Sequence, residues 1–218
     1  MSNAVFNNSK LLSRVRGVIE VGASIGEEIP EWEKSKIKSQ IFIEPIRECY
    51  SILEVRSKQQ SHHPSVKCFN LALSDYDGEA NFHISTDSFC SSSLLDFSKE
   101  AVRYGQTLQT SEVRKVLVRR LDSLVESGEF QISDYNLLYI DVQGNEQKLI
   151  QGAEKSLSSF DYVFSEVNFI PLYDGLTLWE DFRDYMINKG FRLVNIRKLE
   201  GSQGCQGEAL FFRNDIKF

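Results

Sequence analysis

The sequence predicts an α/β fold: a mostly parallel, twisted sheet with helices on both faces and an antiparallel hairpin at the C-terminal end. Short apolar, β-branched runs alternate with amphipathic stretches along the 218 residues, and the last two such runs flank a glycine-rich loop. Alternation of this kind is typical of parallel strands joined by helical crossovers. No internal repeat and no Pro/Ser-rich linker interrupts it. We therefore expect one domain over residues 1–218, with its core at about 17–213.

The first half of the chain supplies three strands and two helices. Strands are expected at residues 18–21, 41–45 and 66–73, and helices at 27–38 and 46–58. Pro30 lies near the first turn of its helix, where a missing N–H costs little, and Pro45 closes the second strand. An Asp-Tyr-Asp-Gly turn at 75–78 then changes the pattern.

The second half begins with a half-exposed strand at 80–85 and then resumes the alternation. A serine-rich loop over 88–93 leads into a helical or irregular stretch to about residue 110, followed by a strand at 113–121 and a short helix at 122–128. Beyond Asn136 we expect strands at 137–142 and 162–167 and helices at 146–157 and 178–189. The closing hairpin pairs 191–196 with 208–213.

Composition and charge argue against several classes of protein. Hydrophobic residues make up 41% and charged residues 26%, an ordinary globular balance, and the net charge of −6 argues against a nucleic-acid binder despite a basic cluster at 114–120. No apolar run reaches the roughly 18 to 20 residues that span a bilayer, and residues 1–16 carry no secretory signal. Four separated cysteines indicate reduced thiols and a cytoplasmic protein, and three clustered histidines are too few for a zinc site.

Candidate binding residues lie at the carboxyl ends of the predicted strands, where parallel sheets bind ligands. The first strand runs into a glycine loop, Glu20-x-Gly22-x-x-x-Gly26, which is either a ligand loop or a tight strand–helix turn. Glu44 ends the second strand and is placed to accept hydrogen bonds from both ribose hydroxyls of an adenosine, unless it is simply a solvated acid.

The loop favours an adenosine cofactor without phosphates. Ser24 stands where the dinucleotide fingerprint has its middle glycine, which leaves less room for a pyrophosphate. S-adenosylmethionine fits better, and Glu20 would orient its ammonium directly or through water. The candidate cofactor-binding residues at these strand ends are Glu20, Gly22, Ala23, Ser24, Gly26, Glu44, Asn70, Leu71, Ala72 and Asp141.

An ordered set of motifs resembles the FkbM family of methyltransferases. The matching stretches are IEVGASIG at 19–26, IEP at 43–45, ALSD at 72–75 with DG at 77–78, LDSL at 121–124, YIDVQGNE at 139–146, QGAE at 151–154 and SEV at 165–167. Their order and spacing agree with the family from about residue 18 to 212. The family usually has Asp at Glu20 and Asn at Ser24, and Gln143 and Asn145 depart from its IDVEGAE motif.

The resemblance implies a Rossmann-like, three-layer class I methyltransferase fold and S-adenosylmethionine as cofactor. It also implies methyl transfer to a hydroxyl, often on a sugar, a glycan or a polyketide product. We therefore expect a small-molecule or glycan acceptor, no nucleic acid and no membrane span, and we leave a homodimer open.

Asp141 and Glu166 end neighbouring central strands and are the first candidates for the catalytic base. Two carboxylates in one cleft can have well-separated pKa values, and the one with a raised pKa would act as the base. Alternatively, Asp141 caps the following helix or holds the methionine end of the cofactor. His83 is a third candidate base, with a packing role as its alternative. With Asn168, the two carboxylates could also hold Mg²⁺, although we expect a site without metal.

Two other functions compete with methyl transfer. Residues 22–26 also satisfy G-x-S-x-G, so Ser24, Asp75 and His83 could form a hydrolase triad. That nucleophile elbow normally follows several strands that build the oxyanion hole, whereas only about 20 residues precede Ser24. A non-catalytic binding module on the same fold is the other alternative.

Overall fold

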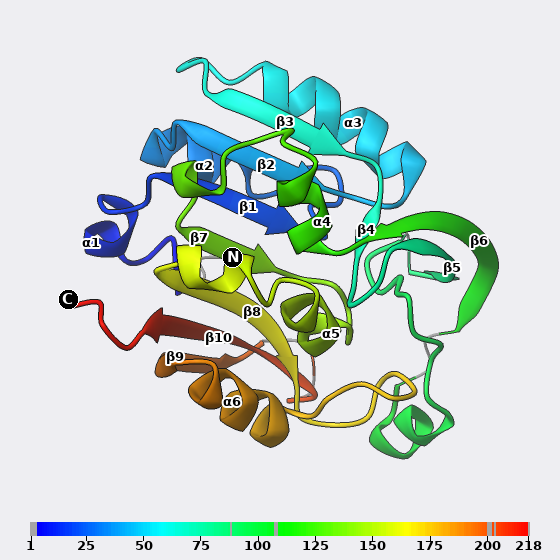
Figure 1. Cartoon of the computed structure of the whole chain (residues 1–218). Helices are drawn as coiled ribbons and strands as arrows, with labels where there is room; N and C mark the ends of the chain where they lie inside the picture. The colour runs from blue at the N-terminus through cyan, green and yellow to red at the C-terminus, as the bar shows by residue number, and fades with distance from the viewer. Residues whose placement is uncertain (1–3, 88, 107–108, 200–201, 203, 218) are drawn as a thin grey trace.

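A seven-stranded sheet forms the centre of the computed structural model, which describes residues 4–87, 89–106, 109–199, 202 and 204–217 (Figure 1). Its strand order is β3-β2-β1-β7-β8-β10-β9. The first five strands are mutually parallel, and β10 is antiparallel to both β8 and β9, as the sequence predicts. The strands are β1 (Gly17–Val21), β2 (Ser39–Ile43), β3 (Ser65–Phe69), β7 (Leu137–Ile140), β8 (Tyr162–Asn168), β9 (Phe191–Lys198) and β10 (Gln206–Arg213).

Helices cover both faces of this sheet because successive strand residues point to opposite sides. Val18 packs in a buried cluster with residues of α1 (Ser9–Leu12), α2 (Ile29–Ser35) and α3 (Arg47–Lys58). The next residue, Ile19, packs on the other face with residues of α4 (Leu121–Glu126), α5 (Glu146–Gln151) and α6 (Trp179–Asn188). The expected three-layer α/β class is therefore confirmed. Short 3₁₀ turns add η1 (Lys99–Tyr104), η2 (Ile132–Asp134) and η3 (Ser156–Ser159).

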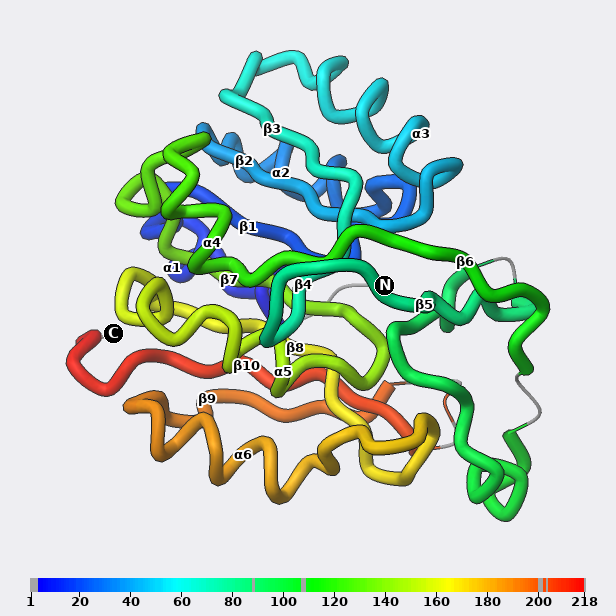
Figure 2. The backbone as a smooth tube through the Cα atoms, turned by 45° about the vertical axis from the view of Figure 1, so that its right-hand side comes forward, coloured from blue at the N-terminus to red at the C-terminus, as the bar shows by residue number. Residues whose placement is uncertain are grey.

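A second, three-stranded sheet of order β4-β6-β5 lies beside the carboxyl ends of the central strands (Figure 2). It consists of β4 (Ala72–Leu73), β5 (Gly78–Ser85) and β6 (Thr110–Arg119). The single strand expected at 66–73 is thus wrong, because the chain leaves the central sheet after Phe69 and pairs with β6 from Ala72. The side chain of Asn70 stabilises the chain between β3 and β4 by donating hydrogen bonds to the backbone carbonyls of Glu44 (2.9 Å) and Pro45 (3.0 Å).

Two helices are shorter than expected by five residues or more, each for a local reason. The helix expected at 27–38 ends at Ser35, because Lys36 adopts a left-handed backbone conformation (φ +55°). The helix expected at 146–157 ends at Gln151, and a 3₁₀ turn follows at η3. A Cβ on Gly152 would lie 1.9 Å from the carbonyl oxygen of Ser74, so this end of α5 passes very close to the chain after β4.

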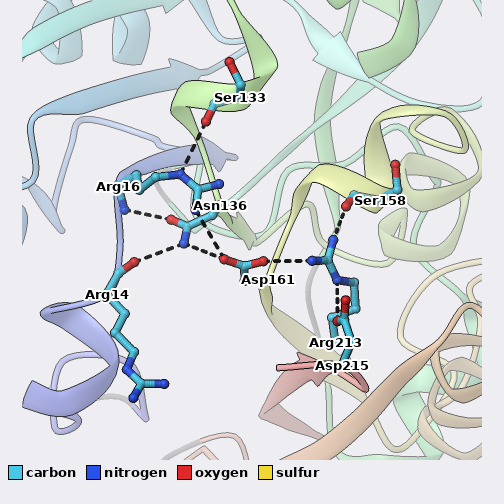
Figure 3. Close-up of polar contacts among 8 residues, drawn as sticks. All are labelled: Arg14, Arg16, Ser133, Asn136, Ser158, Asp161, Arg213 and Asp215. Atoms are coloured by element: carbon cyan, nitrogen blue, oxygen red, sulfur yellow. Dashed lines mark hydrogen bonds and ion pairs between the residues drawn. The ribbon is translucent and has the colours of Figure 1, made fainter. Parts of the chain in front are cut away.

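A polar cluster ties the chain together at the amino ends of the central strands (Figure 3). The Asp161 carboxylate accepts hydrogen bonds from Asn136 (2.9 Å), Arg213 (3.1 Å) and Arg16 (3.5 Å). The buried Asn136 side chain also accepts from the Arg16 amide (2.8 Å) and donates to the Arg14 carbonyl (3.0 Å). These contacts join the segment before β1 to the starts of β7 and β8 and to the end of β10. They lie at the sheet edge opposite the carboxyl ends.

Among the described residues, no helix is long and apolar enough to cross a membrane.

Candidate functional site

A cavity of about 210 Å³ lies at the carboxyl ends of β7, β1 and β2. The strand order reverses between β1 and β7, and parallel sheets bind their ligands at such a point. We call it the carboxyl-edge cavity. Six of the predicted cofactor-binding residues line it: Gly22, Ser24, Glu44, Leu71, Ala72 and Asp141. Glu20, Ala23, Gly26 and Asn70 are not part of its lining.

Glu44 anchors the glycine loop to the end of β2. One carboxylate oxygen accepts the amide N–H of Ser24 (2.9 Å) and the other accepts that of Ile46 (2.6 Å). Burial raises the pKa of Glu44 to about 7, and these two N–H donors oppose that shift. Each carboxylate oxygen has a second lone pair, so both can still accept a hydroxyl from the cavity.

Glu20 points away from the cavity, into the layer beneath α2. It is 1% exposed, and its carboxylate accepts the indole N–H of Trp32 (2.5 Å). Burial and the neighbouring Glu28 raise the pKa of Glu20. A hydrogen bond between the two carboxyls partly opposes the rise in the pKa of Glu28. Glu28 itself lines the cavity, as does Glu27. The predicted contact between Glu20 and a cofactor ammonium would therefore pass through Glu28 or through water.

Glu28 is a site residue that the sequence analysis missed. Burial and the charge of Asp141 raise its pKa to about 7. The sequence does place two acids there, because Glu27 and Glu28 follow Gly26 directly at the carboxyl edge of the sheet. Acids at that position also suit the first turn of the helix expected from residue 27, so residue type alone does not separate the two roles.

The side chain of Gln143 links Asp141 and Glu166 by hydrogen bonds. The Gln143 amide nitrogen donates to Asp141 (2.7 Å) and to Glu166 (2.8 Å), and its oxygen accepts the hydroxyl of Tyr173 (2.8 Å). The Gln206 amide also donates to Glu166 (2.9 Å). Gln143 reaches this position from a left-handed backbone conformation (φ +52°).

The two carboxyls of this pair differ in their access to the cavity and in how far their pKa values are raised. Burial raises the pKa of Asp141 to about 6, and a hydrogen bond with Glu166 opposes that rise. Burial and the charge of Asp141 raise the pKa of Glu166 well above its usual range. These shifts favour the protonated form of Glu166 over that of Asp141. Only Asp141 lines the cavity, and Glu166 lies behind it.

His83 and the hydrolase constellation are not assembled around the cavity. The Nδ1 atom of His83 lies 3.4 Å from the Asp96 carboxylate and 3.5 Å from the Thr110 hydroxyl. The Ser24 hydroxyl donates to Glu27 (3.4 Å), and Asp75 accepts the hydroxyl of Ser74 (3.1 Å). Ser24, Asp75 and His83 thus have separate partners.

The described residues contain no group of three or more His, Cys, Asp or Glu side chains that could hold a metal ion. Asn168, the third residue considered for Mg²⁺, is 1% exposed, and its amide makes no hydrogen bond within the described part of the chain.

The strand order and the position of the cavity define a class I methyltransferase fold, and solved structures agree. Sp1610 of Streptococcus pneumoniae, a candidate tRNA (m1A22) methyltransferase, matches 100% of this chain and 72% of its own, with a TM-score of 0.53 and 13% identity. The magnesium protoporphyrin IX methyltransferase ChlM of Synechocystis PCC 6803, solved with bound S-adenosylmethionine, matches 96% of this chain and 76% of its own, with a TM-score of 0.54 and 9% identity.

Residues 20–193 match the FkbM methyltransferase domain, so the chain belongs to the FkbM methyltransferase family. The resemblance seen in the motifs is confirmed. A second structure of Sp1610 also contains S-adenosyl-L-methionine, and it matches 97% of this chain and 74% of its own, with a TM-score of 0.50 and 13% identity. No curated protein matches the chain significantly.

Proposed function

We propose that this protein transfers a methyl group from S-adenosylmethionine to a hydroxyl group of a sugar, a glycan or a related small molecule. The observation that carries the cofactor assignment is the charge of the carboxyl-edge cavity. Four carboxyl side chains line it (Glu27, Glu28, Glu44 and Asp141), and its described lining contains no Lys, Arg or His. Like charges in a partly buried site repel one another, so such a cavity favours a cationic ligand.

The residues fit the cofactor at both ends. Glu27, Glu28 and Asp141 come from the β1 and β7 side and suit the ammonium and the sulfonium. Glu44, at the end of β2, suits the ribose hydroxyls because both of its oxygens have accepting capacity to spare. Beyond Glu44 the wall becomes apolar, with Ile46 and Leu71 placed for the base. Bound S-adenosylmethionine supplies an electrophilic methyl group on a positively charged sulfur.

Asp141 is the proposed proton acceptor. It lines the cavity and its pKa is raised only to about 6, whereas Glu166 lies behind it and has a pKa raised well above its usual range. Asp141 would take the hydroxyl proton of the acceptor as the oxygen bonds to the methyl carbon and the sulfur–methyl bond breaks, which would give a methyl ether and S-adenosylhomocysteine. Gln143 positions Asp141 through its 2.7 Å hydrogen bond and keeps Glu166 behind it. Holding the acceptor oxygen and the methyl group in near-attack geometry supplies the larger part of the rate enhancement in such catalysis.

The proposed acceptor class rests on the family resemblance and on the polar groups around the acid pair. Gln143, Tyr173 and Gln206 surround Asp141 and Glu166 with amide and hydroxyl groups. Groups of this kind suit a ligand that is rich in hydroxyls. The four free cysteines support the cytoplasmic setting that we propose.

Calorimetry with two ligands tests the cofactor assignment. Glu28→Gln should weaken S-adenosylmethionine binding by about tenfold and leave methylthioadenosine, which lacks the amino-acid moiety, unaffected. Glu44→Gln should weaken both ligands by about 1 to 3 kcal/mol, because both contain the ribose. Glu126→Gln on α4 removes the same charge outside the cavity and serves as the control. Equal losses of the two ligands in Glu28→Gln would contradict the assignment of the ammonium end.

Methyl transfer itself is tested with methyl-labelled S-adenosylmethionine and a panel of sugars, glycans and hydroxylated small molecules. Label found on a hydroxyl oxygen supports the proposal. Tight binding of S-adenosylmethionine without transfer to any member of a broad panel would favour a non-catalytic binding module instead.

A further inference from the structure

The loop that follows β5 reaches over the carboxyl-edge cavity. We call its described residues, 85–87 and 89–93, the serine loop. We propose that Phe89 of this loop holds the adenine ring of the cofactor and closes the apolar end of the cavity. This inference rests on the proposed function, since it assigns a contact to the cofactor proposed there.

Side-chain hydrogen bonds hold the serine loop in one conformation. The Asp87 carboxylate accepts the hydroxyl of Ser85 and both the amide (3.2 Å) and the hydroxyl (2.5 Å) of Ser91. The Ser85 amide donates to the Ser92 hydroxyl (3.0 Å). The Ser93 hydroxyl donates to the carbonyl of Gln143 (2.7 Å), which ties the loop to the segment after β7. The described residues of the serine loop therefore form a hydrogen-bonded part of the cavity wall.

Phe89 adopts a backbone conformation that only glycine adopts readily. Its φ is +80°, in the left-handed region where a bulky side chain is strained. Such strain persists where the surrounding structure enforces it, and it clusters at ligand sites. Here the strained backbone places the Phe89 side chain in the cavity wall, beside Phe82 and Leu94.

The Phe89 ring is supported from outside the cavity. The guanidinium of Arg114 lies 5.9 Å from the ring centroid and is not part of the cavity lining. Arg114 is held in turn by both oxygens of Glu48 (2.8 and 2.9 Å) and by Glu112 (2.8 Å). Arg114 therefore contacts the ring without entering the cavity.

The position of this surface assigns it to the base and not to the amino-acid end. The carboxylates Glu27, Glu28 and Asp141 lie on the β1 and β7 side of Glu44. Phe89 belongs instead to the apolar cluster of Ile46 and Cys49, at the start of α3 beyond β2. A purine offers two apolar faces, and stacking on an aromatic side chain suits it.

Of the two phenylalanines that line this wall, Phe82 and Phe89, Phe89 is the one that we assign to the ligand. Phe82 is 6% exposed and belongs to the buried part of the same cluster, so its first role is packing. Phe89 is only partly buried and packs at the margin of the cluster.

Calorimetry with S-adenosylhomocysteine and methylthioadenosine on Phe89 variants tests the inference. Phe89→Gly and Phe89→Ala should weaken both ligands by similar factors of about 10 to 100, because both ligands contain adenine. Phe89→Tyr keeps the ring and should restore binding to within about threefold of the wild type. Tyr76→Ala, which removes an exposed aromatic ring (43% exposed) from the turn before β5, is the matched control and should not change either affinity.

Phe89→Gly also separates binding from folding. Glycine adopts a positive φ without strain, so the melting temperature of the ligand-free variant should be unchanged or raised while affinity falls. Wild-type affinity in both Phe89→Gly and Phe89→Ala would overturn the inference and leave the proposed function standing. A loss limited to S-adenosylhomocysteine would also overturn it, because the contact would then lie at the amino-acid end. Failure of the wild type to bind either ligand would overturn the proposed function as well.

Discussion

A Cβ atom on Gly22 would lie 1.7 Å from the carbonyl oxygen of Asp141, so the loop after β1 crosses the end of β7 at a distance that only glycine allows. The backbone of Gly22 also has a φ of +82°, and its amide donates to the carbonyl of Ile43 (2.9 Å). The interpretation of the glycine loop as a tight strand–helix turn is therefore confirmed, and its contact with a ligand stays a prediction. The glycine is required by the fold, and the same crossing brings the loop and Asp141 to one wall of the cavity.

Gly22→Ala should destabilise the protein by at least about 3 kcal/mol or prevent folding, because both the left-handed φ and the backbone clash oppose a side chain. Gly128→Ala is the matched control, since Gly128 has a φ of +76° and a Cβ added there would meet no atom of the described residues within 4 Å. It should cost only about 1 to 2 kcal/mol. Urea denaturation of the two variants makes the comparison, and equal losses would contradict the role of the crossing.

The cavity carboxyls predict opposite pH dependences for stability and for cofactor binding. The pKa values of Glu28 and Glu44 are raised from 4.5 to about 7, and that of Asp141 from 3.8 to about 6. Protonation of these groups therefore favours the folded state below their unfolded pKa values, and this stability is lost as the pH rises toward about 7. Ionisation over the same range should strengthen binding of S-adenosylmethionine, by at least about tenfold between pH 5.5 and pH 8.

Melting curves of the ligand-free protein measure the pH dependence of stability, and calorimetry measures that of cofactor binding. Both are recorded across about pH 5 to 8, the range of these pKa values. Glu28→Gln removes one of the groups and should reduce both slopes. Wild-type slopes in that variant would show that other groups are responsible.

Asp141→Asn tests the base. Asn keeps the shape and can still accept the hydrogen bond of Gln143, but it carries no negative charge to accept a proton. Methyl transfer should fall by about 10² to 10⁴, whereas a residue that merely caps the next helix would lose about 1 kcal/mol of stability or less. Turnover and melting temperature are to be measured on the same variant. Near-normal turnover would exclude Asp141 as the base and leave Glu166 and then His83 to be tested.

Asn136→Ala should destabilise the protein without affecting the cavity. Its buried side chain makes hydrogen bonds to Arg14, Arg16 and Asp161 at the edge of the sheet opposite the site. Losing them should cost about 2 to 4 kcal/mol, because buried polar groups are left without partners. Chemical denaturation measures the loss. Calorimetry below the new melting temperature should give wild-type affinity for S-adenosylmethionine, and a weakened affinity would show that the two edges are coupled.

The central sheet and much of the cavity were predictable from the sequence. Local patterns suffice there, because apolar runs such as Leu137–Ile140 mark the strands and parallel strands end at a common edge. Gly22, Glu44 and Asp141 all follow such runs directly, so their positions at the cavity required no knowledge of distant contacts.

Features that depend on contacts between distant segments were not predictable in this way. The strand expected at 66–73 divides because Ala72 pairs with Val118, which is remote in sequence. Glu20 turns away from the cavity because it shares the face of Val18, and Trp32 of α2 binds it there. The left-handed backbone of Gln143 is equally invisible in a pattern of residue types.

The absence of Lys, Arg and His from the described cavity lining has a consequence for turnover. Methyl transfer converts a sulfonium into a neutral thioether, so the spent cofactor has lost the charge that the carboxylates attract. The same electrostatics that favour loading thereby weaken the hold on the product. We therefore expect the cavity to bind S-adenosylhomocysteine more weakly than S-adenosylmethionine, which favours exchange of the used cofactor for fresh cofactor.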